Sequence, residues 1–371
     1  MLNSHRVWVE INLPQLCENY RRIARSVAPC RVLAVLKANA YGLGVEPVAR
    51  ALAQSGAWGF GVAEPREAAQ LLPLGKRVQI LSAVLPDEIE DMVRGNVILP
   101  ATDLETARLI SAAACQLNRV ATVHCKIDTG MGRLGILERN ALETVREISK
   151  LPALRLEGIF THFPVAYEPE NPHTQKQVET FLALLDALRS EGIVFDLVHA
   201  ANSDAINNLP RAFQPPFNLV RTGLNLHGSF DTEGARNLDL HPVLTLKTRL
   251  TAIRALPAGH PVGYGLTFRA PTAMRVGTIS AGYADGLPLA LSNRGHVVIH
   301  GAPCPVLGRV SMDYTTVSLE NVPHAQVGDE VVCLGSTPGA PTIEEWASLK
   351  ATHPYEIICS LGNRVKRVYK T

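Results

Sequence analysis

The feature that most constrains the fold is a regular alternation of short apolar segments with amphipathic ones between residues 32 and 226. The apolar segments have the length and aliphatic composition of buried strands, and the segments between them have the periodicity of one-sided helices. The predicted strands cover residues 32–37, 58–63, 78–83, 96–100, 121–128, 154–163, 195–201 and 218–226. The predicted helices cover residues 45–55, 65–72, 86–94, 103–117, 139–150, 174–191 and 202–208. Eight strands that alternate with helices favour a parallel (β/α)₈ TIM-type barrel over an open sheet.

The pattern changes near Arg236, beyond which glycine and proline separate strand-like segments. Strands are predicted over residues 243–254, 275–281, 296–300, 315–319, 330–334 and 355–361, and one helix over residues 343–349. This pattern is typical of a mostly antiparallel β domain. We therefore expect an α/β chain with a barrel over residues 1–236 and a β domain over residues 237–371. An early strand over residues 7–12 could equally join the β domain, and a helix is expected over residues 13–27.

Composition excludes several classes of protein. The 371 residues suffice for about two domains with a large core. The net charge of +2, without a Lys/Arg run, gives no argument for nucleic-acid binding. No apolar leader follows Met1 and no window reaches the roughly 18 apolar residues of a membrane span, so we expect a cytoplasmic protein without a membrane partner. The seven cysteines include no Cys-x-x-Cys pair, so neither a metal site nor a disulfide framework is predicted.

The first predicted barrel strand ends in Lys37, the single charged side chain of an otherwise aliphatic run. Burial favours the neutral form of a lysine, and a neutral amine is the nucleophile that forms Schiff bases with carbonyl compounds. The alternative is a lysine that extends from the strand end into solvent. In such barrels the reactive groups come from the carboxyl ends of strands. The polar residues near those ends are Lys37, Lys126, Asp128, His162, His199, Asn202, Ser203 and Arg221.

Two loops of the predicted barrel are suited to an anion. Phosphate sites in such barrels often use the loops after the seventh and eighth strands. Asn202 and Ser203 lie in the first of these loops, and residues 222–224 (Thr-Gly-Leu) lie in the second. Taken singly, each loop is better explained as a helix cap or a turn. Together with Lys37, they favour a phosphate-bearing cofactor that reacts with an amine.

Residues 34–44 read Ala-Val-Leu-Lys-Ala-Asn-Ala-Tyr-Gly-Leu-Gly and resemble the pyridoxal-phosphate lysine motif of alanine racemases, the fold-type III amino-acid racemase family. This resemblance implies that Lys37 binds pyridoxal 5'-phosphate covalently and is one of two catalytic bases, while Tyr41 helps to hold the cofactor phosphate. Residues 126–135 (Lys-Ile-Asp-Thr-Gly-Met-Gly-Arg-Leu-Gly) resemble the segment whose arginine, here Arg133, binds the ring oxygen of the cofactor and the substrate carboxylate. Lys126 matches a lysine that is often carbamylated in the family and then steadies this arginine.

The resemblance continues through residues 158–163, 199–203 and 220–223. It implies that His162 links the catalytic tyrosine to Arg221, that His199 lines the cofactor ring, and that Arg221 faces the pyridine nitrogen. An arginine does not readily release its proton, so the pyridine nitrogen would stay unprotonated and the ring would be a weaker electron sink. That property disfavours transamination. The other implied cofactor contacts on the barrel are Asn202, Ser203, Gly223 and Leu224.

The second predicted domain carries further matches. Tyr264, in Val-Gly-Tyr-Gly, resembles the second base, which acts on the face opposite to Lys37. Tyr355, in Pro-Tyr-Glu, resembles a tyrosine that reaches the cofactor phosphate. Met312 would offer its backbone N–H to the substrate carboxylate, and Ser311 stands where many members have cysteine, which leaves the preferred side chain open. The residues implied at the entrance or behind the site are Lys126, Tyr283 and Asp313.

The sequence therefore predicts an alanine racemase activity with a two-base mechanism, which supplies D-alanine for cell-wall peptidoglycan. One alternative is a serine or broad-specificity racemase of the same fold. Another is a pyridoxal-phosphate-binding regulatory protein, although such proteins are single barrels without a Tyr264-bearing domain. The resemblance also implies a head-to-tail homodimer in which each active site takes Lys37 from one chain and Tyr264 from the other.

Overall fold

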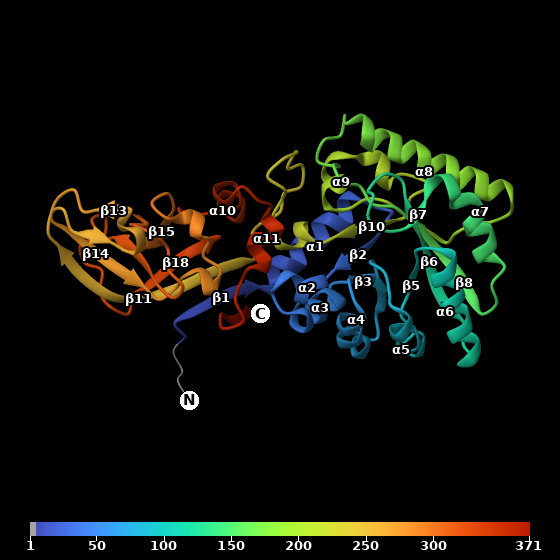
Figure 1. Cartoon of the computed structure of the whole chain (residues 1–371), viewed down its shortest axis with the longest axis horizontal. Coiled ribbons are helices and arrows are strands. Elements are labelled where there is room, and N and C mark those ends of the chain that lie inside the picture. The colour runs from blue at the N-terminus through green and yellow to red at the C-terminus, as the bar shows by residue number, and fades with distance from the viewer. Residues whose placement is uncertain (1–4) are drawn as a thin grey trace.

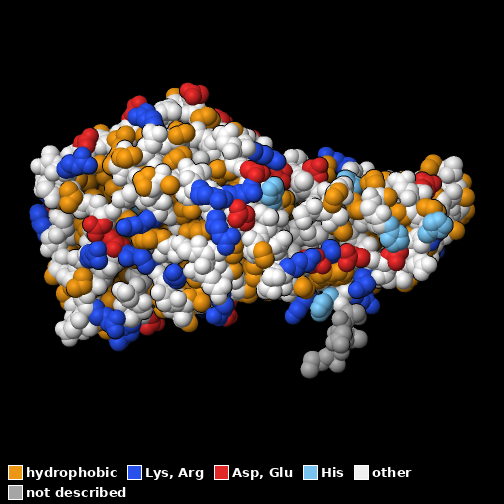
Figure 2. Space-filling model, turned by 180° about the vertical axis from the view of Figure 1, so that it is seen from behind, with side chains coloured by type: hydrophobic (Ala, Val, Ile, Leu, Met, Phe, Trp, Pro, Cys, Tyr) orange, Lys and Arg blue, Asp and Glu red, His pale blue; other side chains and the backbone are white. Residues whose placement is uncertain are grey.

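The computed structural model describes residues 5–371, and Figure 1 shows them as two parts along the long axis of the molecule. A barrel with surrounding helices lies at one end, and a domain rich in strands lies at the other. On the face seen in Figure 2, Lys and Arg side chains lie among Asp and Glu side chains, so no single charge dominates that face. Within residues 5–371, no helix has the length and apolar character needed to cross a membrane.

Eight parallel strands form the barrel, which confirms the predicted fold class. Four of them pair in the order β10-β2-β3-β4 and four in the order β5-β6-β8-β9. Backbone hydrogen bonds close both seams, from Ile80 N to Ile98 O at 3.0 Å and from Asn218 N to Val198 O at 3.0 Å. The barrel strands are β2 (Arg31–Val35), β3 (Gly59–Val62), β4 (Arg77–Ile80), β5 (Leu99–Ala101), β6 (Ala121–Asp128), β8 (Leu154–Phe160), β9 (Leu197–His199) and β10 (Leu219–Thr222). The two-residue strand β7 (Ile136–Leu137) pairs with the end of β6.

Amphipathic helices surround this barrel at the positions that the periodicity predicts. In α1 (Leu13–Ser26), which precedes the first barrel strand, Leu16, Tyr20 and Ile23 are buried at helical spacing, and the Asn12 side chain accepts a capping hydrogen bond from Gln15 N at 3.0 Å. The helices that follow are α2 (Lys37–Tyr41), α3 (Val45–Gln54), α4 (Pro65–Leu71), α5 (Ile89–Arg94), α6 (Leu104–Gln116), α7 (Glu138–Ser149), α8 (Pro172–Ser190) and α9 (Ser203–Asn208). Short 3₁₀ turns are η1 (Leu72–Leu74), η2 (Pro86–Glu88), η3 (Pro210–Phe213) and η4 (Leu224–His227).

The second domain is built on the long strand β11 (Leu244–Leu256), with the sheet order β16-β15-β18-β11-β1-β19. The early strand β1 (Val7–Asn12) pairs antiparallel with β11 and parallel with the last strand, β19 (Lys366–Lys370). One large hydrophobic cluster extends from the barrel into this sheet. The remaining elements are β12 (Pro261–Val262), β13 (Phe268–Arg269), β14 (Met274–Ile279), β15 (His296–Ile299), β16 (Ala302–Pro305), β17 (Thr315–Ser318), β18 (Glu330–Gly335), α10 (Ile343–Lys350), α11 (Pro354–Cys359), η5 (Tyr264–Leu266), η6 (Tyr283–Asp285) and η7 (Leu289–Leu291).

Two local predictions are wrong. The strand expected over residues 355–361 is helix α11, in which Pro354 occupies the first turn and Ile357 and Ile358 are both 1% exposed. The two isoleucines have a high strand propensity, but a proline in the first turn and packing against α10 favour a helix. Residues 224–226, expected to continue the last barrel strand, form η4, which a hydrogen bond from Leu226 N to Gly223 O at 3.0 Å closes.

Candidate active site

Lys37 stands directly after β2, at the carboxyl end of the barrel. The residue is accessible to solvent, yet the protein around its amine desolvates it and lowers the pKa of Lys37. The positive charge of Arg133 lowers this pKa further, against smaller opposing effects of Cys359 and Glu67. A larger fraction of the amine is therefore neutral, and hence nucleophilic, than in a free lysine.

The chain that follows Lys37 makes a left-handed turn, which the sequence did not predict. The φ angles are +53° at Ala38, +56° at Asn39, +53° at Ala40 and +53° at Tyr41. Residues with a Cβ lose about 1–2 kcal/mol each in this region, so other contacts must impose it. The contacts that hold the turn are Glu67 with Ala38 N, Asn39 Oδ1 with Val45 N at 2.8 Å, Arg367 Nε with Gly42 O at 3.0 Å, and Tyr369 Oη with Leu43 O at 2.8 Å.

Arg221 lies at the centre of the barrel mouth and is 4% exposed. Its Nη1 donates to His199 Nδ1 at 2.8 Å, and its Nη2 lies 3.4 Å from His162 Nδ1. Nη2 also donates to Thr161 O at 2.7 Å and to Ala200 O at 2.9 Å. Burial lowers the pKa of Arg221 to about 9, which still leaves the guanidinium charged at neutral pH.

The two histidines that contact Arg221 are neutral acceptors. Burial, reinforced by the charge of Arg221, holds the pKa of His162 well below its usual value. The same two causes hold the pKa of His199 well below its usual value. The His199 ring stacks on Phe160 with centroids 4.8 Å apart and an angle of 6° between the planes. The ring positions are therefore fixed by packing as well as by hydrogen bonds.

Asp128 organises the loop that carries Arg133. Its Oδ1 accepts hydrogen bonds from the backbone of Gly130, Met131 and Gly132 at 2.8–3.1 Å, and its Oδ2 accepts one from Arg133 N at 3.2 Å. Burial alone would raise the pKa of Asp128, but these backbone donors together lower it. The carboxylate thus stays charged and holds the Arg133 backbone at the barrel mouth.

Lys126, near the carboxyl end of β6, is 6% exposed. Its Nζ donates to Leu81 O at 3.1 Å and lies 4.5 Å from the centroid of the Phe160 ring. Burial, followed by the charges of Arg221 and Arg133, lowers the pKa of Lys126 to about 7. A substantial fraction of this amine is therefore neutral near pH 7.

Residues from three elements form a small cradle beside Tyr41. Ser203 Oγ accepts a hydrogen bond from Gly223 N at 3.1 Å, and the Tyr41 and Tyr355 rings lie 5.9 Å apart. A Cβ atom on Gly223 would lie 2.2 Å from Tyr41 Oη, so only glycine allows this approach. Asn202 caps α9 through a hydrogen bond from Ala205 N at 3.0 Å, so it orients the Ser203 end of the cradle.

Tyr264, expected from the β domain, lies apart from this barrel mouth. Tyr264 belongs to η5, between β12 and β13, and Figure 1 places β13 at the end of the β domain remote from α2 and the barrel. The side chain of Tyr264 is 72% exposed, and those of Met312 and Tyr283 are 53% and 48% exposed. Asp313 accepts a hydrogen bond from Arg364 at 2.7 Å. Tyr355 differs from Tyr264, because α11 returns to the barrel and carries it to Tyr41.

Sequence reasoning missed the residues that hold the site from behind. Glu67, Arg367 and Tyr369 fix the turn after Lys37, and the His227 ring packs edge-on against Tyr41 with centroids 5.2 Å apart. Glu67 could have been found, because it lies in the first turn of the helix that follows β3 at the same end of the barrel. The contributions of β19 depend on a strand pairing that no local pattern indicates.

A phosphate-bearing aldehyde cofactor fits the residues present. The Gly223 backbone lies so close to Tyr41 that even one added carbon would collide with it, so the absence of a side chain there is what forms the cradle. Next to it, Thr222 Oγ1 is buried without a hydrogen-bond partner in the described part of the chain. Lys37 supplies the amine for covalent attachment, and burial lowers the pKa of that amine. These features define a pyridoxal-phosphate-dependent enzyme of the barrel type with an appended β domain.

Comparison with known proteins identifies the family. The N-terminal domain of alanine racemase matches residues 11–230, and the C-terminal domain of alanine racemase matches residues 243–369. The alanine racemase of Syntrophobacter fumaroxidans is 41% identical over 97% of this chain and 96% of its own length. The chain therefore belongs to the alanine racemase family of pyridoxal-phosphate-dependent isomerases.

Solved structures agree with this assignment. The alanine racemase of the D-cycloserine producer Streptomyces lavendulae has a TM-score of 0.93 and 32% identity, over 100% of this chain and 98% of that one. The alanine racemase of Bartonella henselae, solved with covalently bound pyridoxal phosphate, has a TM-score of 0.88 and 30% identity over 99% and 100% of the two chains. The family and the cofactor expected from the sequence are thus confirmed.

Proposed function

We propose that Lys37 and Tyr264 are the two bases with which this enzyme interconverts L-alanine and D-alanine. Inversion of a carbon that is held in a pocket requires a proton acceptor on one face and a proton donor on the other. Pyridoxal phosphate, when bound, withdraws electrons from the α-carbon of the amino acid and makes its proton acidic. Lys37 would exchange a proton on one face, and Tyr264 on the opposite face.

We further propose that the two bases of one active site come from two chains, and the observation that supports this is the separation of Lys37 and Tyr264 within one chain. The β12–β13 hairpin with Tyr264 is exposed and lies at the end of the β domain away from α2 (Figure 1). One chain therefore contributes Lys37, and a second copy contributes Tyr264. A two-fold, head-to-tail homodimer would make two such sites and would cover apolar side chains near the hairpin, such as Leu266 and Met312, each 53% exposed.

The other residues of the barrel mouth would orient the cofactor and substrate. Arg133 would bind the substrate carboxylate and the ring oxygen, together with the backbone N–H of Met312 from the second copy. Arg221 would donate a hydrogen bond to the pyridine nitrogen, and His162 would link Arg221 to the catalytic tyrosine. His199 would line the ring. The proposed phosphate and entrance residues are Tyr41, Asn202, Ser203, Gly223, Leu224, Tyr283, Asp313 and Tyr355.

Lys126 has a separate proposed role. Its pKa of about 7 leaves a neutral amine that can react with carbon dioxide, and carbamylation would convert a buried cation into an anion. That anion would steady Arg133, whose charge already acts on Lys126. The modification would also reduce the repulsion among Lys126, Arg221 and Lys37 at the barrel mouth.

We further propose the division into a barrel over residues 1–236 and a β domain over residues 237–371, with residues 7–12 counted with the β domain. The pairing of β1 with β11 and β19 supports that last point. The proposed setting is cytoplasmic, with D-alanine supplied to peptidoglycan and with neither nucleic acid nor membrane as a partner.

The serine or broad-specificity alternative is not favoured by Ser311. The Ser311 hydroxyl donates to Tyr314 O at 2.6 Å and lies 3.2 Å from Tyr314 N, so its hydrogen bonds are used within its own turn. The only donor of this hydroxyl is therefore already used, and one lone pair is left toward a substrate hydroxyl. Racemisation of a panel of L-amino acids tests this point. We expect kcat/KM for L-alanine to exceed that for L-serine by at least about tenfold, and equal values would overturn the alanine preference.

A further inference from the structure

A second polar cluster runs through the barrel interior behind Arg221, and the reaction as described uses only its first member, His199. It consists of His199 on β9, His124 on β6 and Glu157 on β8, which are 0%, 0% and 3% exposed. Arg221 Nη1 lies 2.8 Å from His199 Nδ1, and His199 Nε2 lies 3.0 Å from His124 Nδ1. His124 Nε2 lies 3.3 Å from Glu157 Oε2. The four side chains thus form one continuous hydrogen-bonded chain.

The direction of every bond in this chain follows from Arg221. An arginine only donates, so His199 Nδ1 must accept, and a neutral imidazole then carries its proton on Nε2. His199 therefore donates to His124 Nδ1, and His124 donates from Nε2 to the Glu157 carboxylate. Gln79 Nε2 also lies 3.1 Å from His124 Nδ1, so the single lone pair of that nitrogen is shared between two donors. Burial lowers the pKa of both histidines, which keeps them neutral.

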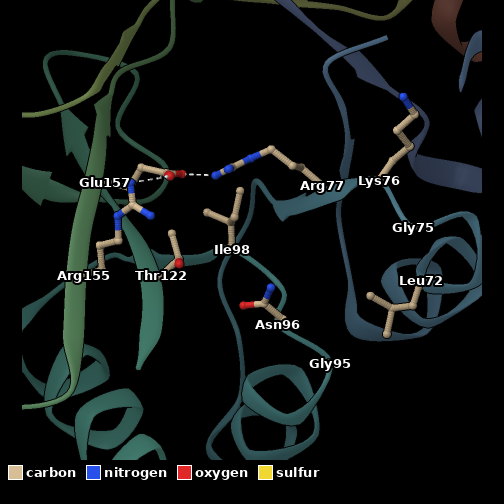
Figure 3. A pocket seen from close by; sticks show the side chains of 10 residues that line it. All are labelled: Leu72, Gly75, Lys76, Arg77, Gly95, Asn96, Ile98, Thr122, Arg155 and Glu157. Carbon is tan, nitrogen blue, oxygen red and sulfur yellow. Dashed lines mark hydrogen bonds and ion pairs between the residues drawn. The ribbon is translucent and has the colours of Figure 1, made fainter. Parts of the chain in front are cut away.

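The far end of the chain lies at the opposite opening of the barrel. Glu157 accepts a hydrogen bond from Arg77, and its Oε1 lies 3.4 Å from Arg155 (Figure 3). Burial would raise the pKa of Glu157, but the hydrogen bonds from His124 and Arg77 lower it to about 2, so the carboxylate is permanently charged. Glu157, Arg77 and Arg155 line a pocket of about 430 Å³, and the Arg77 guanidinium packs over the Trp58 ring at 4.7 Å.

Charge explains why such a chain is useful. The acceptors that contact Arg221 are two backbone carbonyls and two neutral histidines, and within residues 5–371 no carboxylate accepts a hydrogen bond from it. A buried guanidinium without an adjacent counter-charge is costly to keep in place. Glu157 is the negative group to which Arg221 is connected. The connection runs through two imidazoles, and their tautomers fix the donor and the acceptor of each hydrogen bond.

We propose that Glu157, His124 and His199 are positioning residues that hold Arg221 as a charged donor with a fixed orientation. The proposal rests on the proposed role of Arg221 toward the pyridine nitrogen. If Glu157 loses its charge, His124 is no longer bound to keep its proton on Nε2. His199 can then carry its proton on Nδ1, where it opposes the N–H of Arg221. Arg221 would move, and the ring nitrogen would lose the partner that disfavours transamination.

The test uses the cofactor-loaded enzyme and its Glu157→Gln variant, with Arg155→Gln as the matched control. Arg155 contacts Glu157 from the exposed side without touching either imidazole. The measurements are the pyruvate released per alanine racemised, KM for alanine, and the ¹⁵N shifts of labelled histidines. We expect Glu157→Gln to raise the transamination ratio about tenfold with KM within about twofold of wild type, whereas Arg155→Gln leaves both unchanged. An unchanged ratio in Glu157→Gln would overturn the proposal.

Two further measurements separate this inference from the role of Arg221 itself. In the unmodified enzyme, His199 and His124 should both carry the proton on Nε2 alone, and a proton on Nδ1 of either would overturn the chain whether or not any variant folds. Arg221→Gln should change the transamination ratio more than Glu157→Gln does. If Arg221→Gln leaves the transamination ratio unchanged, the assignment of Arg221 to the pyridine nitrogen fails. The positioning role is then judged from the tautomers alone. If His199 and His124 both keep the proton on Nε2 in Glu157→Gln, Glu157 does not set their tautomers and the positioning role fails as well.

Discussion

The two regions that carry the proposed bases are built in opposite ways. At the barrel mouth, Lys37 precedes a backbone turn that distant contacts hold in a strained left-handed form, and Arg221 is 4% exposed with four hydrogen-bond acceptors. At the hairpin of the β domain, Tyr264 is 72% exposed on a three-residue turn between two-residue strands. The barrel mouth is held in place by contacts within its own chain, whereas the hairpin exposes the Tyr264 side chain to solvent.

This difference indicates how the active site is completed. The barrel mouth already has the cations and the cradle that a phosphate-bearing cofactor requires, so it can bind that cofactor within one chain. Under the proposed shared site, the hairpin contributes chemistry only after association with a second copy. Variants at the mouth should therefore act on cofactor binding and on each chain separately, and variants at the hairpin should act on shared sites.

The largest expected effect is that of Lys37→Ala. We expect kcat to fall by about 10³-fold or more, because a general base and the covalent link are lost together. Treatment of the loaded variant with borohydride, followed by mass spectrometry, should show no cofactor attached to the chain. Lys150→Ala, at a side chain that is 62% exposed, is the control and should keep activity and attachment. A cofactor still fixed to the Lys37→Ala chain would show that another amine carries it.

The next prediction tests whether the sites are shared. Lys37→Ala and Tyr264→Ala should each be inactive alone, and a mixture should regain activity after dissociation and reassociation. In a mixed dimer one site lacks both bases and the other keeps both, and random pairing makes about half of all dimers mixed. Recovery should therefore approach about a quarter of wild-type activity per total site.

Proof of subunit exchange, for example by native mass spectrometry of the two variants, is the control for that mixture. If exchange is complete and no activity returns, each chain uses its own Lys37 and Tyr264. The exposure of the hairpin would then not indicate a site shared between two chains.

Sequence reasoning names candidates for the reactive groups more readily than it names the groups that hold them. Lys37 stands out because a lone charge ends an aliphatic strand, and Arg133 and Arg221 lie near strand ends whose direction the barrel fixes. The left-handed turn at Ala38–Tyr41 could not be predicted, because it contains no glycine and its restraints come from Glu67 and from β19. Those contacts follow from the three-dimensional pairing of β19 with β1.

The misassigned helix α11 teaches the same lesson. Ile357 and Ile358 favour a strand locally, yet the segment must bring Tyr355 to Tyr41, and packing against α10 makes it a helix. His124 is a further example, since its role is set by contacts with residues 33 and 75 positions away in the chain. No pattern within β6 separates this histidine from an ordinary core residue.

An intermediate effect is expected from Gly223→Ala at the cradle. The added Cβ would lie 2.2 Å from Tyr41 Oη, so Tyr41 or the cradle must shift. We expect the Kd of the cofactor to rise by about 10- to 100-fold, measured by absorbance titration of the cofactor-free protein. In a Tyr41→Phe background the same substitution should cost less, because the closest colliding atom is gone and the nearest ring carbon lies 2.8 Å from the added Cβ. Equal losses in both backgrounds would mean that Gly223 is not needed for this close approach.

The last effect is on stability and not on activity or binding, and it concerns the charge buried at Lys126. The pKa of Lys126 is about 7 in the folded protein, and a free lysine titrates near 10.4. Between these values the unfolded chain binds more protons, so the free energy of unfolding should rise with pH through this window and be lowest below pH 7. For the cofactor-free protein in buffer without carbon dioxide, denaturant unfolding should show this rise. Lys126→Met should remove a part of it on the order of 4 kcal/mol.

The matched control for Lys126 lies in the hairpin, which makes this a test of the contrast between the two regions. Arg269→Met on β13 removes an exposed charge, and its effect on stability should not change between pH 7 and pH 10. Bicarbonate should flatten the profile of the wild-type protein toward that of Lys126→Met, because a carbamylated amine no longer binds a proton in this range. If the free energies of unfolding of wild type and Lys126→Met differ by the same amount at both pH values, the buried charge of Lys126 does not lower stability. The barrel mouth then differs from the hairpin in packing and exposure only.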